Sequence, residues 1–490
     1  MILSKLLENI DVINSKVDLS ENIEYIFSDS RKSKGNGAFI AIKGEQRDGN
    51  DYVRQILNAN EKCVITDQIS VYESNDQTIL VKDARRALSH AWNNFLEKPT
   101  SDMRIIAITG TNGKTSCANY IYNILKAGNK KRGLISTIEC LINDEIININ
   151  GGSDVVDLHS AMTTPDPEIL FSIFKKMQQE QVEYVVMEAS SHALELFKID
   201  PINVNVAIFT NLSEEHLDFH KNMDNYFMAK SKLFNNCDIG IVNLDDEYGK
   251  KILNKNKEGF FGYSIKKKSD FYASDIEFLN FGIKYILNFK NRNLEIKSKS
   301  FGEFSVYNTM ASVACAIELG IDEKAIQIGI ENTEKIKGRF EKSGENIFID
   351  YAHTPSAMES ILYALKKSMP EKKIIALFGC GGDRDKGKRE KMGKIASDFA
   401  DTVIITSDNS RNEPLTEIIR DILKGFEEKN NYLVIPKRED AINFALKIKK
   451  ENNALILLGK GHEDYEIDKT GKHYFSEKKI IEKALKNDKY

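Results

Sequence analysis

A glycine loop, residues 110–115, directly follows the apolar segment 104–109. Glycines let backbone N–H groups approach phosphate oxygens, and the N-terminus of a following helix favours negative charge. Lys114 can pair with β- and γ-phosphate oxygens, and the Thr115 hydroxyl can bind Mg²⁺. Gly110 and Gly113 are separated by two residues, whereas the general Walker loop has four. The pattern predicts a nucleoside triphosphate site, the alternative being a structural turn.

Polar residues also follow two further apolar segments. Glu188 ends the segment 183–188, and residues 210–220, which contain two histidines and three acids, follow the segment 203–209. An acid at the end of a strand near a phosphate loop can hold Mg²⁺ directly or through water. Solvated surface remains the alternative for each group. By composition alone, Lys230 in the helical stretch 226–234 is an ordinary surface lysine.

The elements that must position these residues read as an α/β fold. The apolar segment, glycine loop and periodic helix after residue 104 are typical of a doubly wound sheet. Residues 38–42 and 62–66 read as strands of an earlier region, and 270–301 as hairpins. From residue 346 onward, a strand–loop–helix pattern indicates a second open sheet, with a helix over 415–429 and strands at 347–350, 374–378, 403–406, 432–435 and 454–458.

The length and composition limit the possible classes of protein. A chain of 490 residues suggests about three domains, which we expect at 1–98, 99–336 and 337–490. A net charge of −4 gives no indication of a nucleic-acid or membrane partner. The six cysteines are scattered singly and predict reduced thiols in the cytoplasm. The first residues do not resemble a signal peptide, and no apolar run reaches the length of a membrane span.

Several motifs, in order along nearly the whole chain, resemble those of the Mur ligases of peptidoglycan synthesis. They include TGTNGKT at 109–115, MEASSH at 187–192, DYAHTP at 350–355, GCGGDRD at 379–385 and GKGHED at 459–464. The similarity is greatest to the branch that adds the third amino acid. The resemblance implies an α/β protein of three domains: an N-terminal uridine-binding domain, a central P-loop ATPase-type doubly wound sheet, and a C-terminal Rossmann-like sheet.

The resemblance also supplies roles around ATP and Mg²⁺. It assigns catalysis to Lys114, Glu188, His216 and Lys230. ATP would be bound by Gly110, Thr111, Asn112, Gly113, Lys114, Thr115, Ser116, Asn308, Arg339 and His353. The Mg²⁺ ligands would be Thr115, Glu188, His216 and Lys230, the lysine carried as a carbamate. An ammonium repels Mg²⁺, whereas a neutral amine that captures CO₂ becomes an anionic oxygen ligand.

The implied reaction makes an amide in cell-wall synthesis, which supports cell shape and division. ATP phosphorylates the D-glutamate side-chain carboxylate of UDP-MurNAc-L-Ala-D-Glu, and an amino acid then attacks the acyl phosphate. The loop 407–414 keeps Arg411, which can grip the distal carboxylate of meso-diaminopimelate. L-lysine is the alternative acceptor. The residues matched to the acceptor pocket are Arg384, Asp408, Asn409, Ser410, Arg411, Gly459 and Glu463.

For the nucleotide sugar, the resemblance points to Ser30, Thr163, Thr164, Ser190 and Lys198. The chain departs from many relatives at three positions: Asn50 stands for a histidine, and Leu196 and Lys198 stand for glutamine and arginine. These departures affect the expected grip on the substrate rather than the class of reaction. The family's usual form is a monomer.

Two other functions compete with this one. A folylpolyglutamate synthetase-like ligase would share the ATPase core, but the first 98 residues and the acceptor loops argue against it. A non-catalytic nucleotide-binding module is a different class, and the set Glu188, His216, Lys230 and Arg339 argues against that.

Overall fold

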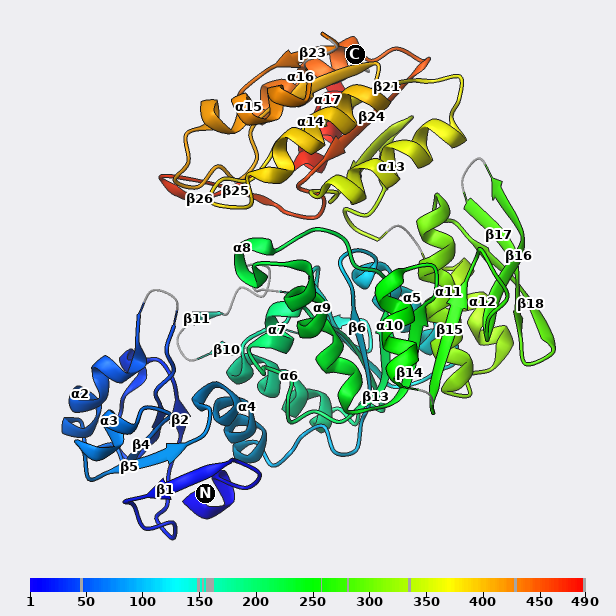
Figure 1. The fold of residues 1–490 in the computed structure, drawn as a ribbon. Coiled ribbons are helices and arrows are strands. Elements are labelled where there is room, and N and C mark those ends of the chain that lie inside the picture. Colours follow the sequence, from blue (N-terminus) through cyan, green and yellow to red (C-terminus); the bar gives the residue numbers. More distant parts are fainter. Residues whose placement is uncertain are drawn as a thin grey trace. The chain divides into compact units, whose positions relative to one another are not determined.

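The computed structural model describes residues 1–44, 47–147, 150–151, 154–155, 163–256, 258–279, 282–333, 336–426 and 430–487. The chain divides into two compact units. Figure 1 labels helices and strands of both. The first unit holds residues 1–109, 130–207 and 229–240, and the second holds 110–129, 208–228 and 241–490. The strands β13 (Val204–Phe209) and β14 (Cys237–Asn243) run from one unit into the other.

The first unit begins with a five-stranded sheet of order β1-β5-β4-β3-β2. Its strands are β1 (Val12–Ser15), β2 (Ile26–Phe27), β3 (Ala38–Ile40), β4 (Cys63–Thr66) and β5 (Thr78–Val81). All neighbours are parallel except β1 and β5. Both strands predicted here are therefore present. The helices of this region are α1 (Leu3–Leu6), α2 (Val53–Asn58), α3 (Ile69–Glu73) and α4 (Ala84–Phe95).

The first unit also contains the strand that leads into the glycine loop. Its strands lie in the order β6-β12-β7-β8-β9, and β6, β12 and β7 are parallel. Their bounds are β6 (Arg104–Thr109), β12 (Tyr184–Glu188), β7 (Arg132–Ile135), β8 (Cys140–Ile142) and β9 (Glu145–Ile146). The remaining elements of this part are β10 (Asn150–Gly151), β11 (Asp154–Val155), α6 (Pro167–Gln179) and α7 (Ser191–Glu195). The predicted strands 104–109 and 183–188 are confirmed.

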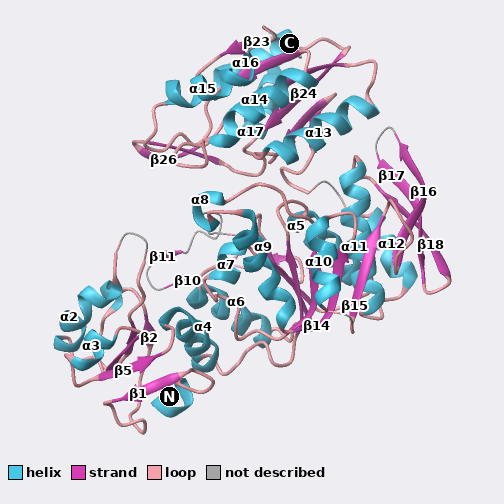
Figure 2. Ribbon diagram, viewed as in Figure 1, coloured by secondary structure: helices cyan, strands magenta, loops and turns pink. Residues whose placement is uncertain are grey.

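In the second unit, helix α5 (Lys114–Ala127) packs against α11 (Glu303–Glu318) and α12 (Glu323–Glu331). The predicted hairpins over 270–301 are the strands β16 (Phe271–Leu279), β17 (Gly282–Phe289) and β18 (Arg292–Ser298), which pair antiparallel. Figure 2 shows them beside α11 and α12. Further elements are α8 (Leu217–His220), α9 (Met223–Ser231), α10 (Glu247–Lys255) and β15 (Phe260–Ser264).

The second unit ends in a six-stranded sheet of order β19-β20-β24-β21-β22-β23. Its strands are β19 (Glu341–Gly344), β20 (Ile347–Asp350), β21 (Lys373–Phe378), β22 (Thr402–Ile405), β23 (Tyr432–Val434) and β24 (Asn453–Leu458). All are parallel except β19. Successive residues point to opposite faces, so Ile374 and Ala376 join one apolar cluster and Ile375 and Leu377 join another.

Helices cover both faces of this sheet, as the doubly wound prediction requires. One face packs against α13 (Pro355–Ser368), α14 (Gly387–Phe399) and α15 (Leu415–Leu423), and the other against α16 (Arg438–Ile448) and α17 (Glu477–Asn487). The helix predicted over 415–429 was too long, because the α-helix ends at Leu423 and a 3₁₀ turn follows to Phe426. Residues 427–429 lie outside the described part of the chain. A small hairpin, β25 (Tyr465–Asp468) and β26 (Gly471–Tyr474), was not predicted.

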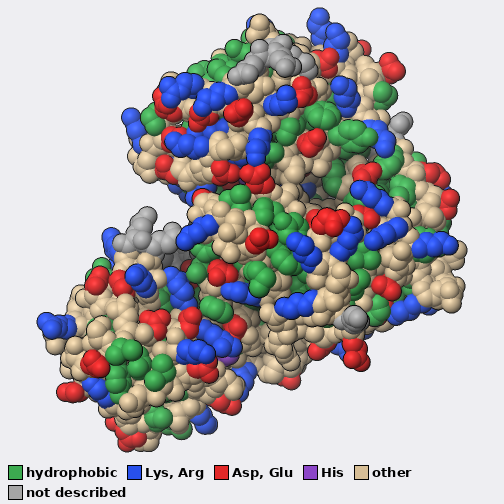
Figure 3. All heavy atoms as spheres, in the orientation of Figure 1, with side chains coloured by type: hydrophobic (Ala, Val, Ile, Leu, Met, Phe, Trp, Pro, Cys, Tyr) green, Lys and Arg blue, Asp and Glu red, His purple; other side chains and the backbone are tan. Residues whose placement is uncertain are grey.

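Charged side chains of both signs are interspersed over the face drawn in Figure 3, which fits the net charge of −4. Among the described helices, none has the length and apolar character needed to cross a membrane.

Candidate active site

The glycine loop has a conformation and surroundings that only glycine fits. Gly110 and Gly113 have φ angles of 147° and 88°, in the region that other residues rarely adopt. A Cβ atom at Gly110 would overlap the Thr210 hydroxyl, and one at Gly113 would overlap the Asn308 side chain. Asn308, from α11, therefore lies directly against the loop, and both glycines are fixed by close approach.

The segment after β13 anchors the loop. The backbone N–H of Thr111 donates to the Asn211 carbonyl at 2.9 Å, and that of Asn112 donates to Asn211 Oδ1 at 2.9 Å. The Thr210 hydroxyl donates to the Asn112 carbonyl at 2.6 Å. These bonds hold the loop at the start of α5, where backbone N–H groups are available to an anion.

Two side chains at the start of α5 are arranged for phosphate chemistry. Lys114 Nζ donates to the carbonyls of Gly110 and Thr111 at 2.9 and 3.0 Å, so its ammonium lies over the loop. The buried Thr115 hydroxyl accepts a 3.0 Å bond from Arg339 Nη2. Ser116 follows in the first turn of the same helix. Arg339 also stacks on the Tyr351 ring, with its guanidinium carbon 4.7 Å from the ring centroid.

A buried carboxylate that was not predicted lies close to this group. Glu215 Oε1 is 2.9 Å from His353 Nε2, and Glu215 Oε2 is 3.6 Å from His216 Nε2. Burial alone would raise the pKa of Glu215. The hydrogen bond with His353 and the positive charges of His216, His353 and Lys114 outweigh burial and hold that pKa well below its usual range. Glu215 thus links two predicted site histidines and stays ionised.

The first unit holds the other predicted carboxylate, Glu188, fully buried at the end of β12. Its Oε1 accepts from the Thr137 N–H at 2.9 Å, and its Oε2 accepts from the Thr137 hydroxyl at 3.0 Å. The Glu188 carbonyl accepts from the Thr164 hydroxyl at 2.9 Å. These neutral donors orient the carboxylate without adding a positive charge.

Three of the residues predicted to contact the sugar peptide, Thr164, Ser190 and Lys198, contact one another in the first unit, and Thr163 is next to Thr164. The Thr163 hydroxyl accepts from Thr137 at 3.2 Å, and the Ser190 N–H donates to the Thr164 hydroxyl at 3.1 Å. Lys198 is buried and pairs with Asp166 at 2.7 Å. Lys198 is therefore a buried cation beside Thr164, to whose carbonyl it also donates at 3.5 Å.

Two of the predicted Mg²⁺ ligands carry oxygen atoms that suit the cation. Glu188 and Thr115 supply hard oxygens, which Mg²⁺ prefers, and both are buried. Lys230 is 1% exposed, and it fits Mg²⁺ only as a carbamate, because an ammonium would repel the cation. No cluster of three or more His, Cys, Asp or Glu residues with metal-binding geometry occurs in the described ranges.

The acceptor loops of the second unit, 379–386 and 407–414, are joined by backbone and side-chain bonds. The Gly382 N–H donates to the Asn409 carbonyl at 2.9 Å, and Arg411 Nη1 donates to the carbonyls of Gly382 and Asn409 at 2.8 and 3.2 Å. The Ser410 carbonyl packs on Gly382. Burial and the neighbouring charge of Arg384 lower the pKa of Arg411. The side chains of Arg384 and Arg411 therefore lie close together, beside Gly381.

Two acidic groups, Asp408 and Glu463, lie near Arg411. Glu463 Oε2 accepts from Asn409 Nδ2 at 2.9 Å. Burial and the nearby charge of Asp408 raise the pKa of Glu463. Burial would raise the pKa of Asp408 as well, but the charge of Lys460 lowers it. Gly459 has a φ of 109°, and a Cβ there would approach an Asp408 oxygen to 2.9 Å. Two cations, Arg384 and Arg411, and two carboxylates, Asp408 and Glu463, therefore lie near one another.

Two residues singled out in the sequence, Ser30 and Asn50, lie in the N-terminal region. Ser30 begins a 3₁₀ turn that Asp29 caps. Asn50, a departure from many relatives, is buried and bonded within its own region, to Asp48 at 2.8 Å and to Thr66 at 2.7 Å. Its amide is thus engaged in holding the loop before α2.

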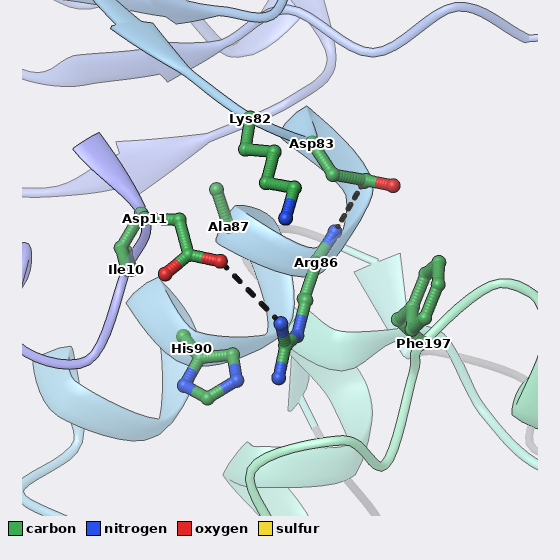
Figure 4. Close-up of a pocket in the computed structure, with 8 residues that line it drawn as sticks. All are labelled: Ile10, Asp11, Lys82, Asp83, Arg86, Ala87, His90 and Phe197. Carbon is green, nitrogen blue, oxygen red and sulfur yellow. Dashed lines mark hydrogen bonds and ion pairs between the residues drawn. The ribbon is translucent and has the colours of Figure 1, made fainter. Parts of the chain in front are cut away.

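A pocket of about 230 Å³ lies elsewhere in the first unit and was not predicted (Figure 4). Arg86 of α4 reaches Asp11 at 3.5 Å and Asp200 at 2.6 Å, and His90 is 2.8 Å from the same Asp200 oxygen. Phe197 lines its rim. The bonds to Asp200 join α4 to the segment after α7. Their role is therefore structural.

Comparisons with known proteins show which family the chain resembles. The Mur ligase middle domain matches residues 108–316, and the Mur ligase glutamate ligase domain matches residues 338–461. A UDP-N-acetylmuramoyl-L-alanyl-D-glutamate–2,6-diaminopimelate ligase from Clostridium botulinum is 38% identical over 95% of this chain and 95% of its own. One of the same name from Caldanaerobacter subterraneus is 40% identical over 96% of each chain.

A solved structure named UDP-N-acetylmuramoyl-L-alanyl-D-glutamate–2,6-diaminopimelate ligase superposes with a TM-score of 0.70 at 26% identity. The match covers 100% of this chain and 99% of that one. The predicted α/β fold of three domains is therefore confirmed, and so is the predicted family. The chain belongs to the Mur ligase family.

Proposed function

We propose that this protein is an ATP-dependent ligase that joins meso-diaminopimelate to the D-glutamate side-chain carboxylate of UDP-MurNAc-L-Ala-D-Glu, forming ADP. Relatives that carry this name match nearly the whole chain. The observation that carries the proposal is the pair Arg384 and Arg411, whose side chains both lie against Gly381, close to the carboxylates of Asp408 and Glu463.

The charges of this pocket suit diaminopimelate better than lysine. Two guanidinium groups close together are stabilised by an anion that pairs with both. Diaminopimelate brings a carboxylate and an ammonium at its distal end, whereas lysine brings only the ammonium. The carboxylate would meet Arg384 and Arg411, and the ammonium would meet Glu463. Lysine would leave the two arginines without an anion.

The first chemical step would transfer a phosphoryl group from ATP. The D-glutamate carboxylate oxygen forms a bond to the γ-phosphorus, and the bond from that phosphorus to the β–γ bridging oxygen breaks, which releases ADP. The loop N–H groups of residues 110–115, the Lys114 ammonium and Arg339 would stabilise the charge on the phosphate oxygens. Asn308 and His353 would contact the nucleotide.

The second step would form the amide. The neutral amine of diaminopimelate attacks the acyl carbon, the bond from that carbon to the phosphate oxygen breaks, and the amine loses a proton. Asp408, Asn409, Ser410 and Gly459 would hold the acceptor, so that catalysis rests on positioning. No covalent intermediate with the enzyme is needed.

Mg²⁺ is proposed as the cofactor. The proposed ligands are Thr115, Glu188, His216 and carbamylated Lys230. When bound, the metal would neutralise negative charge on the phosphate oxygens. Carbon-13 NMR of protein grown with labelled bicarbonate tests the carbamate without relying on activity. A carbamate signal that disappears in Lys230→Ala supports the proposal, and an identical spectrum in that variant contradicts it.

The remaining assignments are part of the same proposal. Ser30, Thr163, Thr164, Ser190 and Lys198 would bind the UDP-MurNAc-dipeptide, within domains at 1–98, 99–336 and 337–490. The proposed enzyme is a monomer that works in cell-wall synthesis without nucleic acid or membrane. Its nucleotide substrates and its six free cysteines support a cytoplasmic location. Through the cell wall, the enzyme would contribute to cell shape and division.

A phosphate-release assay tests the proposed function. Phosphate should be released only when ATP, UDP-MurNAc-L-Ala-D-Glu and diaminopimelate are all present, in equal amount to the amide formed. Hydrolysis of ATP that does not depend on the sugar peptide, or no hydrolysis in the complete mixture, would overturn the ligase assignment.

A further inference from the structure

A fully buried lysine, Lys460, lies next to the carboxylates of Asp408 and Glu463. Lys460 is 0% exposed. Its Nζ atom donates to Asn409 Oδ1 at 3.0 Å and to the Tyr465 carbonyl at 2.8 Å. Carboxylate oxygens of Asp408 and Glu463 lie 3.4 and 3.6 Å from it. A buried ammonium is costly unless it is paired and hydrogen-bonded, and here it is both.

The contacts of Lys460 fix the orientation of the Asn409 amide. Asn409 Oδ1 accepts from Lys460 Nζ and also from the Ile467 N–H at 3.0 Å. Because two donors meet the oxygen, the amide nitrogen must point the other way. That nitrogen donates to Glu463 Oε2 at 2.9 Å. The order of contacts is therefore Lys460 to Asn409 to Glu463.

We propose that Lys460 is a positioning residue for the acceptor amino acid: through Asn409 and by its own charge it holds Glu463 in place, ionised, to receive the distal ammonium. This inference rests on the proposed function, because it assumes that Glu463 binds that ammonium. Lys460 itself need not touch the substrate, since it lies fully buried beneath the groups that would. The proposal adds a specificity role to a residue that carries none in the reaction described above.

The other charges around Glu463 define what Lys460 contributes. Burial and the charge of Asp408 both raise the pKa of Glu463, whereas Lys460 and His353 lower it. Tyr465 and Tyr351 also face this carboxyl, and so does Arg411. Removing the lysine charge should therefore raise the pKa of Glu463 further, and a protonated Glu463 cannot pair with an ammonium.

The test compares Lys460→Met and Lys460→Gln with the wild-type chain in the complete ligation reaction. Both variants should raise KM for diaminopimelate about tenfold or more, with KM for ATP and for the UDP-sugar peptide changed less than about twofold. The acid limb of kcat/KM for diaminopimelate should move to higher pH by about one unit. Lys469→Met, an exposed position between β25 and β26, is the matched control.

A second measurement examines the link through Glu463. If Lys460 acts through that carboxylate, then Glu463→Gln should raise KM for diaminopimelate much less in the Lys460→Met background than in the wild-type chain. Equal effects in both backgrounds, or an acid limb that does not move in either Lys460 variant, would overturn the role of Lys460.

Failure of the two proposals can be told apart. If the wild-type chain does not join diaminopimelate, the proposed function fails, whatever the variants do. If it does and the variants keep the wild-type acid limb, only the Lys460 proposal fails. If neither single variant folds, Lys460→Arg replaces them. It keeps the positive charge but moves the donors that meet Asn409, so KM for diaminopimelate should rise. A KM equal to that of the wild-type chain, or a variant that also fails to fold, would contradict the proposal.

Discussion

His353 and Glu215 lie 2.9 Å apart, Nε2 to Oε1, although 138 positions separate them in the sequence. Glu215 is 10% exposed in its side chain and His353 is 36% exposed. The pair joins the loop after β13 to the loop after β20, within the second unit. Lys114 contributes its charge to the same carboxylate. Glu215 thereby connects the phosphate loop to a residue proposed to contact ATP.

Glu215→Gln should destabilise the protein by about 1.5–3 kcal/mol at pH 7, the usual value of a hydrogen bond to a charged group. Because the folded-state pKa of Glu215 is depressed, its stabilisation is present above the unfolded pKa of about 4.3. The stabilisation is lost as pH falls through the folded-state value. Urea unfolding at pH 7 and pH 3 should therefore show a difference from wild type that shrinks in acid.

The neighbouring residue provides the control for this experiment. Glu214 is exposed and pairs with Lys391, so Glu214→Gln should change stability by less than about 1 kcal/mol. If Glu215→Gln changes stability at pH 7 no more than Glu214→Gln does, then the bond between Glu215 and His353 has no energetic role.

Local patterns predicted much of this fold, and tertiary contacts account for what was missed. The apolar segments at 104–109 and 454–458 are buried on both faces and read clearly as strands. Strands β7, β8 and β9 are only 4, 3 and 2 residues long, which is too short for a period to be visible. Glu215 looked like loop surface, because its partner His353 lies far away in the sequence. Nothing in the sequence near Lys460 indicates that it is buried.

Lys114→Ala should weaken ATP binding strongly and reduce kcat/KM at least about a hundredfold, because it removes a charge aimed at the transferred phosphate. Calorimetric titration of ATP and the ligation rate are the measurements. Lys126→Ala, at the exposed C-terminal end of the same helix, should leave both unchanged. An unaltered ATP affinity and rate in Lys114→Ala would remove this lysine from the phosphate site.

Arg411→Ala should raise KM for diaminopimelate about 10- to 150-fold, since a charge-assisted hydrogen bond is worth about 1.5–3 kcal/mol. KM for ATP should stay near the wild-type value. Arg420→Ala, on exposed α15 surface where it pairs with Glu417, is the matched control. An unchanged KM for diaminopimelate would take Arg411 out of the acceptor pocket.

Asp200→Asn should destabilise the first unit by about 1–3 kcal/mol at pH 7, because it breaks the bonds from Asp200 to Arg86 and His90. Both of these partners line the pocket of Figure 4. Burial raises the pKa of Asp200, but His90 and Arg86 lower it more. This stabilisation is therefore present above the unfolded pKa of about 3.9 and is lost as pH falls further. Chemical unfolding against the exposed Asp102→Asn variant measures it, and equal stabilities would contradict the prediction.

The acceptor assignment is the centre of this account, and a competition assay measures it most directly. The chain is incubated with ATP, Mg²⁺, UDP-MurNAc-L-Ala-D-Glu and equal amounts of meso-diaminopimelate and L-lysine, and the products are separated by mass. Because Arg384 and Arg411 face an anion that only diaminopimelate supplies, its product should exceed the lysine product at least about tenfold. A larger lysine product, or no amide with either amino acid, would contradict the account.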